Sequence, residues 1–423
     1  MKHFLLSLTF LWGLSPAFAQ EPAPQKKFQG QGEVEAVPTT PRPVQLQHRT
    51  TYHFTDLGVS VSNEFPGARL NGMLQREDTL IAWITAENSP INPSPWYAFK
   101  LWAEQPRELY IKLTYEGARH RYYPKLSKDG VHWSALDSAH YQPFRQGDAD
   151  FGVGSLPEYV RIKVEVGPDT LWLAGQELWN SPRVHAWVDS LSQLDFVRSE
   201  VFGESRMGKP MEVMTIGEAK KQNKVVLAIS RQHPPEVSGF LAMKSFIETI
   251  CGDSRLARKF RKQYTLLAIP LMNPDGVDMG HWRHNAGGVD LNRDWSQRHH
   301  PETRAVKALL DQRLKADDSQ LYFGIDFHST WDDIYYTLDS TVNTNAPGLI
   351  AEWLSSLENE LPDYSVNAKG NISAAGVSKN FMYFEYGAES LVYEVGDNTP
   401  RPFIQQKGEV AAQQLMRLLL EAD

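Results

Sequence analysis

The hydrophobic pattern of the chain changes near residue 180, and this change constrains the fold more than any other feature. Before it, apolar and polar residues alternate in short segments such as Glu108–Tyr115, which is typical of strands with one face in water. Residues 121–126 and 131–133 predict a β-hairpin, because an Asp-Gly pair between them can supply the positive φ of a tight turn. Several such strands at short spacing predict an antiparallel β-sandwich over residues 51–180.

After the change, segments with the pattern of strands alternate with segments that have the periodicity of helices. We predict strands at residues 211–216, 224–230, 264–271, 320–327 and 390–395, and helices at residues 186–197, 241–250, 301–314 and 403–421. This alternation predicts an α/β domain over residues 181–423, built on a mixed, largely parallel sheet flanked by helices. Ligands of such sheets bind beyond the ends of the strands, so a site is expected there.

The first nineteen residues have the pattern of a secretory signal peptide. Basic residues precede an apolar run over residues 4–14, and Ala17 and Ala19 are the small residues that a signal peptidase reads. We therefore expect cleavage after Ala19 and a periplasmic or secreted protein. Residues 20–50 are rich in proline, glutamine and charge and have no apolar period, which predicts a flexible linker.

Charge and cysteine content exclude several classes of protein. The 423 residues include 43 Lys and Arg and 51 Asp and Glu, a net charge of −8, which argues against a nucleic-acid binder. One cysteine, Cys251, rules out an intramolecular disulfide and a cysteine-rich zinc module, and we interpret it as a core residue. No segment approaches the roughly 18 apolar residues of a membrane span, so none is expected. These features leave the oligomeric state open.

Two apolar strands lead into residues that can bind zinc. The predicted strand 224–230 is followed by His233 and Glu236, three residues apart, and the strand 320–327 is followed by His328. Two histidines and one glutamate leave the fourth position of a tetrahedral zinc ion open to water, which is typical of catalytic rather than structural zinc. Each of these residues alone is more often structural, so the prediction of a metal site depends on the meeting of all three.

A second His-x-x-Glu pair, His299 and Glu302, repeats this spacing. It follows a polar run, and Glu302 falls in the first turn of a predicted helix, where an acidic side chain complements the helix dipole. We therefore interpret this pair as structural. Asp326, two residues before His328, is a candidate hydrogen-bond partner of that histidine.

The segments between the candidate ligands carry a long motif. It comprises Asn273–Val277 (Asn-Pro-Asp-Gly-Val), then Arg283, then Asp290–Trp295 (Asp-Leu-Asn-Arg-Asp-Trp). In the first predicted domain, Ser94–Lys100 and Tyr122–Gly130 complete the pattern. Together these motifs resemble the zinc metallocarboxypeptidases, and within them the cytosolic-carboxypeptidase-like branch, which carries a β-sandwich ahead of the peptidase domain. The resemblance covers nearly all of the chain after the predicted linker.

The resemblance implies a metallocarboxypeptidase with one Zn²⁺ per chain, held by His233, Glu236 and His328. Its substrate is expected to be the carboxy-terminal peptide bond of peptides or protein tails. Glu394 matches the general base, which accepts a proton from water and passes it to the leaving amine. From the residue alone, Glu394 could instead be an ion-paired residue of the framework. The signal peptide contradicts a cytosolic location despite the name of the branch.

Three basic and amide side chains match substrate-binding positions of the family. Arg283 is expected to stabilise the oxyanion, and Asn292 and Arg293 to hold the terminal carboxylate, for which a guanidinium is suited. Structural salt bridges are the alternative for both arginines. Lys379, aligned through its Gly-x-Ser-Lys context, would lie at the floor of the pocket for the departing residue, which predicts a preference for carboxy-terminal Glu or Asp. The alternative for Lys379 is a side chain in solvent.

Two features leave further alternatives open. Residues 370–374 lack the tyrosine that covers the substrate in many family members, so either another residue covers the site or this lid is absent. The predicted sandwich is rich in tryptophan and tyrosine, which favours core packing over a carbohydrate-binding platform. The alternative functions are therefore a zinc amidohydrolase or carboxypeptidase acting on cell-wall peptides, and an inactive binding protein that uses the aromatic sandwich.

Overall fold

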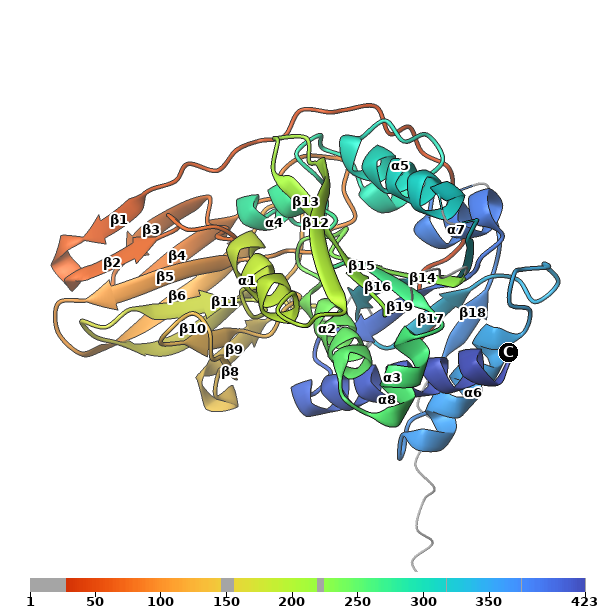
Figure 1. The fold of residues 1–423 in the computed structure, drawn as a ribbon. Helices are drawn as coiled ribbons and strands as arrows, with labels where there is room; N and C mark the ends of the chain where they lie inside the picture. Colours follow the sequence, from red (N-terminus) through yellow and green to blue (C-terminus); the bar gives the residue numbers. More distant parts are fainter. Residues whose placement is uncertain (1–27, 146–155, 219–223, 317, 374, 423) are drawn as a thin grey trace, which may run out of the picture.

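The computed structural model describes residues 28–145, 156–218, 224–316, 318–373 and 375–422. The predicted signal peptide, residues 1–19, lies outside the described residues. In the described part, a β-sandwich and an α/β unit lie side by side, as the fold prediction has it (Figure 1).

The sandwich consists of a six-stranded and a five-stranded sheet. The first contains, in order across the sheet, β1 (Thr51–Phe54), β2 (Val59–Ser62), β5 (Ala98–Ala103), β11 (Leu171–Ala174), β7 (Lys125–Ser127) and β8 (Ser134–Ala135). The second contains β3 (Gly72–Arg76), β4 (Thr79–Ile84), β6 (Arg107–Tyr115), β10 (Tyr159–Val166) and β9 (Tyr141–Phe144). Neighbouring strands are antiparallel apart from β4 and β6. These two run parallel because the chain crosses to the other sheet through β5 between them.

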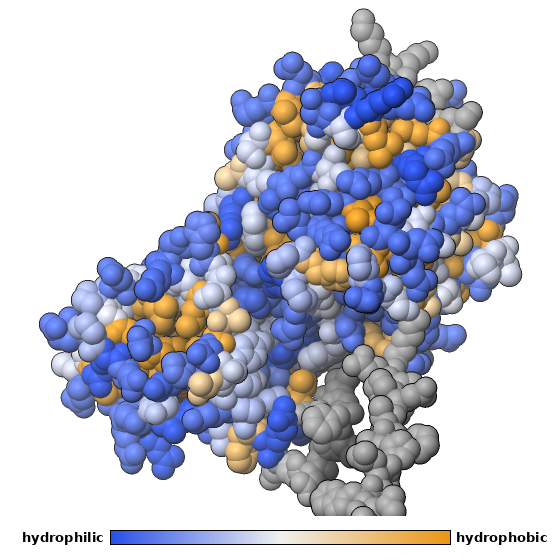
Figure 2. Space-filling model, turned by 90° about the horizontal axis from the view of Figure 1, so that it is seen from below, coloured by the Kyte–Doolittle hydropathy of each residue, from blue (hydrophilic) through white to orange (hydrophobic). Residues whose placement is uncertain are grey.

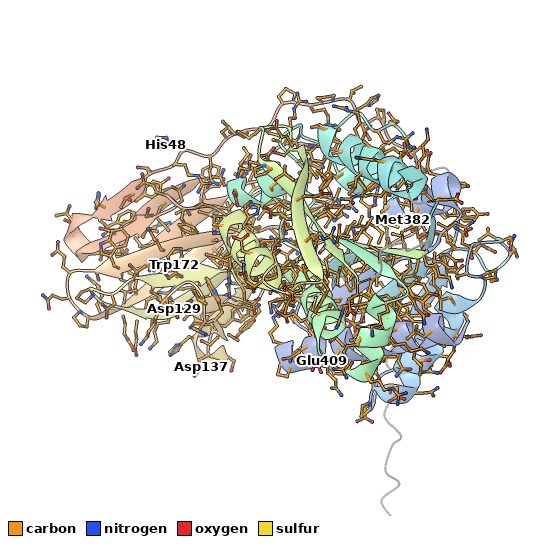
Figure 3. The ribbon with its side chains drawn as sticks, in the orientation of Figure 1. His48, Asp129, Asp137, Trp172, Met382 and Glu409 are labelled. Carbon is orange, nitrogen blue, oxygen red and sulfur yellow. The ribbon has the colours of Figure 1, made fainter. Side chains whose placement is uncertain are left out.

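A hairpin is present near the predicted place, but its strands are shifted toward the C-terminus, and the strand predicted at residues 131–133 is wrong because these residues lie in the loop. β7 pairs with β8, and Gly130 in the loop between them has a φ of +75°. The Asp129 carboxylate accepts the N–H groups of Val131 and His132, which shapes the loop beside Trp172 (Figure 3). The side chain of Asp129 therefore organises the loop, and the strands begin only outside it.

The aromatic residues of the sandwich serve mainly as core. Trp96, Tyr97 and Tyr122 are buried in the same apolar cluster as strands of both sheets. Trp282, from the α/β unit, belongs to this cluster and is fully buried. The two parts of the molecule therefore share one packed boundary, which agrees with the packing interpretation of these aromatics.

The α/β unit contains an eight-stranded mixed sheet. Its strands, in order, are β12 (Val197–Glu204), β13 (Pro210–Ile216), β15 (Thr265–Ile269), β14 (Lys224–Ser230), β16 (Gln320–Thr330), β19 (Glu389–Gly396), β17 (Ile334–Thr337) and β18 (Ala368–Gly370). The four central strands β15, β14, β16 and β19 run parallel, and β12, β13 and β17 are antiparallel to a neighbour. The predicted mixed, largely parallel sheet is thereby confirmed.

Helices cover both faces of this sheet (Figure 1). One face carries α1 (Ser181–Leu191), α2 (Val237–Cys251), α3 (Arg255–Arg261), α6 (Leu349–Glu360) and α8 (Arg401–Glu421). The other carries α5 (Pro301–Ala316) and α7 (Ser378–Tyr386), and the short helix α4 (Pro274–Met279) lies next to α1. Along β14, Val226 and Ala228 enter one core while Leu227 and Ile229 enter the other, so a central parallel strand reads as a continuous apolar run. Cys251 lies in the first of these cores, as predicted.

Most predicted elements of the α/β unit differ in their bounds from the structure, and two of these differences are informative. The helix predicted at residues 186–197 begins at Ser181, because the Asn180 side chain accepts the N–H of Arg183 and a proline occupies the first turn. It ends at Leu191, and Val197 already belongs to β12. The strand predicted at residues 320–327 continues to Thr330 and so contains His328.

The prediction of a flexible linker is wrong for residues 28–50, which lie against the folded units. Thr39 is fully buried, and its hydroxyl donates to Asp294 at 2.5 Å. The N–H groups of Arg42 and Gln45 donate to the carbonyl oxygens of Gly287 and Glu87, respectively. These backbone bonds and one buried threonine supply the contacts that composition alone does not reveal. Residues 20–27 lie outside the described part.

No helix in the described part of the chain is long and apolar enough to cross a membrane. A smaller and a larger lobe are visible from below, and polar side chains cover most of that face (Figure 2).

Candidate metal centre

The loop after β14 brings two candidate ligands to the end of the sheet. Arg231 follows the strand with a φ of +58°, in the left-handed region that few non-glycine residues adopt. Its guanidinium donates to the carbonyl oxygens of Trp179 and Pro234, which fixes the turn. Glu236 then occupies the position before the first turn of α2.

α2 approaches β16 closely because Gly239 has no side chain. A Cβ atom at Gly239 would lie 2.2 Å from the carbonyl oxygen of His328, well inside van der Waals contact. The N–H of Gly239 donates to Oγ of Ser329 at 2.8 Å, and the N–H of Ser329 donates to Oε2 of Glu236 at 3.2 Å. The first turn of the helix is therefore fastened to the strand that carries His328.

The side chains of His233, Glu236 and His328 meet at one buried point. Nδ1 of His233 lies 2.8 Å from Oε1 of Glu236, and Nδ1 of His328 lies 2.6 Å from Oε2. The two Nδ1 atoms are 3.1 Å apart, and candidate ligand atoms of all three residues lie within 4.8 Å of one another. The structure therefore brings together the three residues that the sequence singles out.

Each histidine has a carboxylate behind it. Nε2 of His233 lies 2.8 Å from Oδ1 of Asp290, and Nε2 of His328 lies 2.8 Å from Oδ2 of Asp326. A carboxylate can only accept, so with a metal ion bound at each Nδ1 the Nε2 atoms would carry the protons and donate to these carboxylates. Asp326 is therefore within hydrogen-bond distance of His328, as the sequence suggested.

This arrangement fits a zinc ion. Two imidazole nitrogens and one carboxylate, each oriented from behind, form the donor set of catalytic zinc sites, which keep a further position for water or substrate. A cation at this buried point would be in reach of both Nδ1 atoms and of the Glu236 carboxylate. His233, Glu236 and His328 could therefore hold one metal ion.

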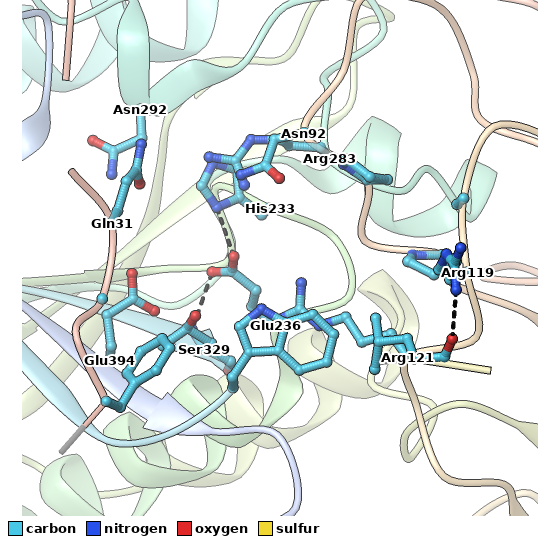
Figure 4. A pocket seen from close by; sticks show the side chains of 18 of the residues that line it. Gln31, Asn92, Arg119, Arg121, His233, Glu236, Arg283, Asn292, Ser329 and Glu394 are labelled. Carbon is cyan, nitrogen blue, oxygen red and sulfur yellow. Dashed lines mark hydrogen bonds and ion pairs between the residues drawn. The ribbon is translucent and has the colours of Figure 1, made fainter. Parts of the chain in front are cut away.

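A pocket of about 580 Å³ opens onto the metal centre, and most of the sequence-predicted site residues line it. These are His233, Glu236, Arg283, Asn292, Arg293 and Glu394. Glu236 lies between His233 and Ser329, with Glu394 and Gln31 to one side and Arg119 and Arg121 to the other (Figure 4). Arg119 and Arg121 come from the sandwich, so both parts of the molecule form the walls.

Asp290 links the metal centre to the neighbouring basic side chains. Its carboxylate accepts from Nε of Arg283 at 2.8 Å and lies 3.9 Å from Nη1 of Arg293. Although burial opposes ionisation, Arg283 and His233 hold the pKa of Asp290 well below its usual value. The Asn292 amide oxygen accepts the N–H of Ser378 at 2.8 Å, which fixes the direction of that side chain. The alternative of structural ion pairing therefore holds for Arg283 in part, but its side chain still faces the pocket.

Glu394 lies on β19 beside the metal centre. Its Oε2 atom is buried and has no hydrogen-bond partner within the described residues. Burial raises the pKa of Glu394 to about 8, and the neighbouring carboxylate of Glu236 contributes to the increase. A carboxylate that can take up a proton near neutral pH is suited to proton transfer.

Lys379 is buried in the first turn of α7 and lines a small adjoining pocket of about 50 Å³. Nζ donates to the carbonyl oxygen of Asn371 at 2.5 Å and to Oδ1 of Asn380 at 3.1 Å. No carboxylate pairs with this ammonium among the residues that the structure describes. Burial lowers the pKa of Lys379 to about 8. The alternative of a lysine in solvent is therefore wrong.

Part of the wall of the small pocket comes from the N-terminal strap, which we define as residues 28–34. Gln31, Gly32 and Val34 line the pocket together with Lys379. The N–H of Gln31 donates to the hydroxyl of Tyr336 at 2.6 Å, and its carbonyl oxygen accepts from Lys369 at 3.0 Å.

Several residues that line or support the site were not predicted from the sequence. Asp290 stands inside the Asp-Leu-Asn-Arg motif, so a search for partners of the ligands could have found it. Tyr336 on β17 lines both pockets, although the family position for a covering tyrosine, residues 370–374, has none. The strap carries no pattern that marks it as part of a site.

The second His-x-x-Glu pair lies elsewhere and is hydrogen-bonded within the framework. Glu302 accepts from Nδ2 of Asn285 at 3.1 Å and from the N–H of Arg206 at 3.1 Å. Nδ1 of His299 lies 3.2 Å from the hydroxyl of Thr39. These partners agree with the structural interpretation of the pair.

Residues 184–412 match the sequence model of a family described as zinc carboxypeptidase. The chain is 27% identical over 234 residues to an uncharacterized protein of Zymomonas mobilis, a match that covers 55% of this chain and 58% of that protein. It is 29% identical over 157 residues to cytosolic carboxypeptidase 6 of Mus musculus, covering 35% of this chain and 29% of the mouse protein. The match thus spans little more than half of the first relative and less than a third of the second.

Solved structures show the same fold over both parts of the molecule. A metallo-carboxypeptidase from Burkholderia cenocepacia superimposes with a TM-score of 0.67 at 19% identity, covering 86% of this chain and 99% of that chain. A metallo-carboxypeptidase from Pseudomonas aeruginosa, solved with (2-guanidinoethylmercapto)succinic acid, gives a TM-score of 0.65 at 18% identity, covering 86% of this chain and 100% of that chain.

Proposed function

The chain belongs to the zinc carboxypeptidase family, and we propose that it removes single residues from the carboxy termini of peptides or protein tails. The observation that carries this proposal is the pocket of about 580 Å³ at the metal centre. That pocket combines candidate metal ligands, two arginines and a carboxylate whose buried Oε2 atom has no hydrogen-bond partner within the described residues, which are the groups that hydrolysis of a terminal peptide bond needs.

His233, Glu236 and His328 would hold one zinc ion per chain. Zinc bound there lowers the pKa of a water molecule and polarises the carbonyl group of the scissile bond. Asp290 and Asp326 keep the proton of each imidazole on Nε2, so both Nδ1 atoms are available as ligands.

Glu394 acts as general base and then as general acid. It accepts one proton as the water oxygen adds to the carbonyl carbon, and it returns that proton to the amine nitrogen as the peptide bond breaks. Its free Oε2 atom and raised pKa support this role, because the same side chain must both take up and release a proton.

Arg283 and Arg293 each bind one of the two negatively charged groups of the reaction. Arg283, held by Asp290 beside the metal centre, stabilises the negative charge on the carbonyl oxygen. Arg293 and the Asn292 amide bind the terminal carboxylate of the substrate.

The terminal side chain of the substrate enters the small pocket and meets Lys379. A buried ammonium without a carboxylate partner favours an acidic guest, so the enzyme prefers carboxy-terminal Glu or Asp. The strap forms part of the wall of the pocket and limits it to short side chains.

Export to the periplasm or the exterior is also part of this proposal. The basic start, the apolar run over residues 4–14 and the Ala-x-Ala end at Ala19 support it. Mass spectrometry of the mature amino terminus tests it; a protein that retains residues 1–19 in the cytosol contradicts it.

A digest of a peptide library by the wild type and by Glu394→Gln tests the whole proposal. We expect loss of single carboxy-terminal residues with the wild type alone, with acidic residues released fastest. Internal cuts contradict the exopeptidase assignment. Selective release from cell-wall peptides favours the alternative substrate class, and absence of hydrolysis together with less than about one zinc per chain favours a binding protein.

A further inference from the structure

A carboxylate of the sandwich is bound to the backbone that carries Arg283. Glu87 lies in the loop between β4 and β5 and is fully buried. Its Oε2 atom accepts the N–H of Trp282 at 2.7 Å. Its Oε1 atom accepts the N–H groups of Arg283 at 3.0 Å and His284 at 2.7 Å. Three successive backbone donors thus converge on one side chain from the other part of the molecule, in the manner of an anion-binding nest.

These three donors depend on Glu87. Residues 282–284 belong to neither a helix nor a strand, so their N–H groups have no partner in regular structure. A buried N–H without an acceptor loses its hydrogen bond to water without a replacement, which makes this backbone conformation unfavourable once the carboxylate is gone. The His281 and His284 side chains and the backbone donors keep the pKa of Glu87 lowered, although burial acts in the opposite direction.

Trp282 and Arg283, which are neighbours on this backbone, have side chains that point in opposite directions. Trp282 is buried in the core of the sandwich, and its Nε1 donates to the carbonyl oxygen of Trp96 at 3.1 Å. Arg283 instead lines the pocket at the metal centre and donates to Asp290. The position of the guanidinium is therefore set from one side by Asp290 and from the other by the sandwich.

We propose that Glu87 is a positioning residue for the hydrolysis reaction, which acts by holding the backbone of residues 282–284 so that Arg283 faces the scissile carbonyl. This inference rests on the proposed role of Arg283. It assigns the sandwich a direct part in catalysis, because the sandwich supplies the acceptor that shapes one wall of the active site.

Steady-state kinetics of Glu87→Gln, Arg283→Ala and the double variant test this proposal. A glutamine keeps the shape but offers one acceptor oxygen and places an N–H₂ group against backbone donors. We expect kcat of Glu87→Gln to fall about 10- to 100-fold with little change in KM, since the terminal carboxylate is bound by other residues. The double variant should have the kcat of Arg283→Ala within about twofold, because Glu87 acts through Arg283.

Two further variants separate positioning from loss of stability. Glu87→Asp keeps two acceptor oxygens and should regain part of kcat, which also serves if Glu87→Gln fails to fold. Leu109→Ala opens a cavity in the sandwich core. Leu109 is buried on β6, close to the turn between β5 and β6, and it pairs with Val164 of β10. This substitution should lower the melting temperature while kcat per zinc-loaded molecule stays at the wild-type value.

An unchanged kcat in Glu87→Gln overturns the inference. The inference also fails if Glu87→Gln lowers kcat by the same factor in Arg283→Ala as it does in the wild type. An unchanged kcat in Arg283→Ala instead overturns the proposed role of Arg283 itself, so the two failures are distinguishable.

Discussion

Glu394 and His328 lie directly opposite each other on the neighbouring parallel strands β19 and β16. Because paired residues of adjacent strands face the same side of a sheet, the carboxylate of Glu394 stands next to a candidate metal ligand. Asp326, two residues before His328 on β16, lies on the same face and contacts Nε2 of His328. Sheet register alone therefore places a proton acceptor beside the metal centre.

Replacement of Glu394 by glutamine should abolish most of the activity without loss of metal. The amide has similar volume but cannot accept the proton of the attacking water. We expect kcat to fall by a factor of about 10²–10⁴ while KM and zinc content stay near the wild-type values. Kinetics on a short peptide, with metal analysis of the same samples, checks this. A variant that retains more than a tenth of kcat would show that another group serves as the base.

Lys379→Met should remove the preference for acidic carboxy termini. Methionine fills similar space but cannot pair with a carboxylate, and a hydrogen bond to a charged group contributes about 1.5–3 kcal/mol. We expect kcat/KM for a peptide ending in Glu to fall about 10- to 100-fold relative to one ending in Leu. Lys259→Met, which removes an exposed lysine of α3 that lines neither pocket, is the matched control. Equal values for both peptides with the wild type contradict the specificity proposal.

The preference for acidic residues should depend on pH. Burial lowers the pKa of Lys379 to about 8, so its ammonium is charged below this value and neutral above it. The ratio of kcat/KM for peptides ending in Glu and in Leu should therefore be high near pH 7 and fall as the pH rises through about 8. Titration of groups that affect both peptides equally cancels in this ratio of kcat/KM values. A ratio that is flat across this range, or that falls on acidification, contradicts the role of Lys379.

Removal of the strap should widen the choice of terminal residue. Without residues 28–34, the pocket that holds Lys379 loses Gln31, Gly32 and Val34 from its wall. We expect peptides ending in large residues to gain kcat/KM about 10-fold relative to those ending in Asp. Thr39, which anchors the following segment to Asp294, remains in this variant. A uniform increase for all peptides would instead show that the strap blocks the site.

The fold was largely predictable because each central strand and helix is patterned locally. The strand 224–230 reads as a continuous apolar run because both of its faces are buried, and its bounds match β14. The start of α1 was missed because Asn180 and Pro182 determine it, not apolar periodicity. The burial of Thr39 depends on contact with Asp294, more than 200 positions away, for which composition holds no signal.

The candidate site was predictable where chemistry follows a strand. His233, Glu236 and His328 stand at or near strand ends, and zinc limits the residue types that can serve there. Glu87 could not be found in this way, because its role depends on backbone N–H groups that sequence does not distinguish. The position of Gln31 depends equally on packing between distant segments.

The central claim is that His233, Glu236 and His328 hold one zinc ion, and the two His-x-x-Glu pairs allow a direct test by metal analysis after dialysis. We expect about one zinc per chain in the wild type and in Glu302→Gln, and less than about a tenth in Glu236→Gln. Full zinc in Glu236→Gln, or hydrolysis by a wild type that contains none, would contradict the account.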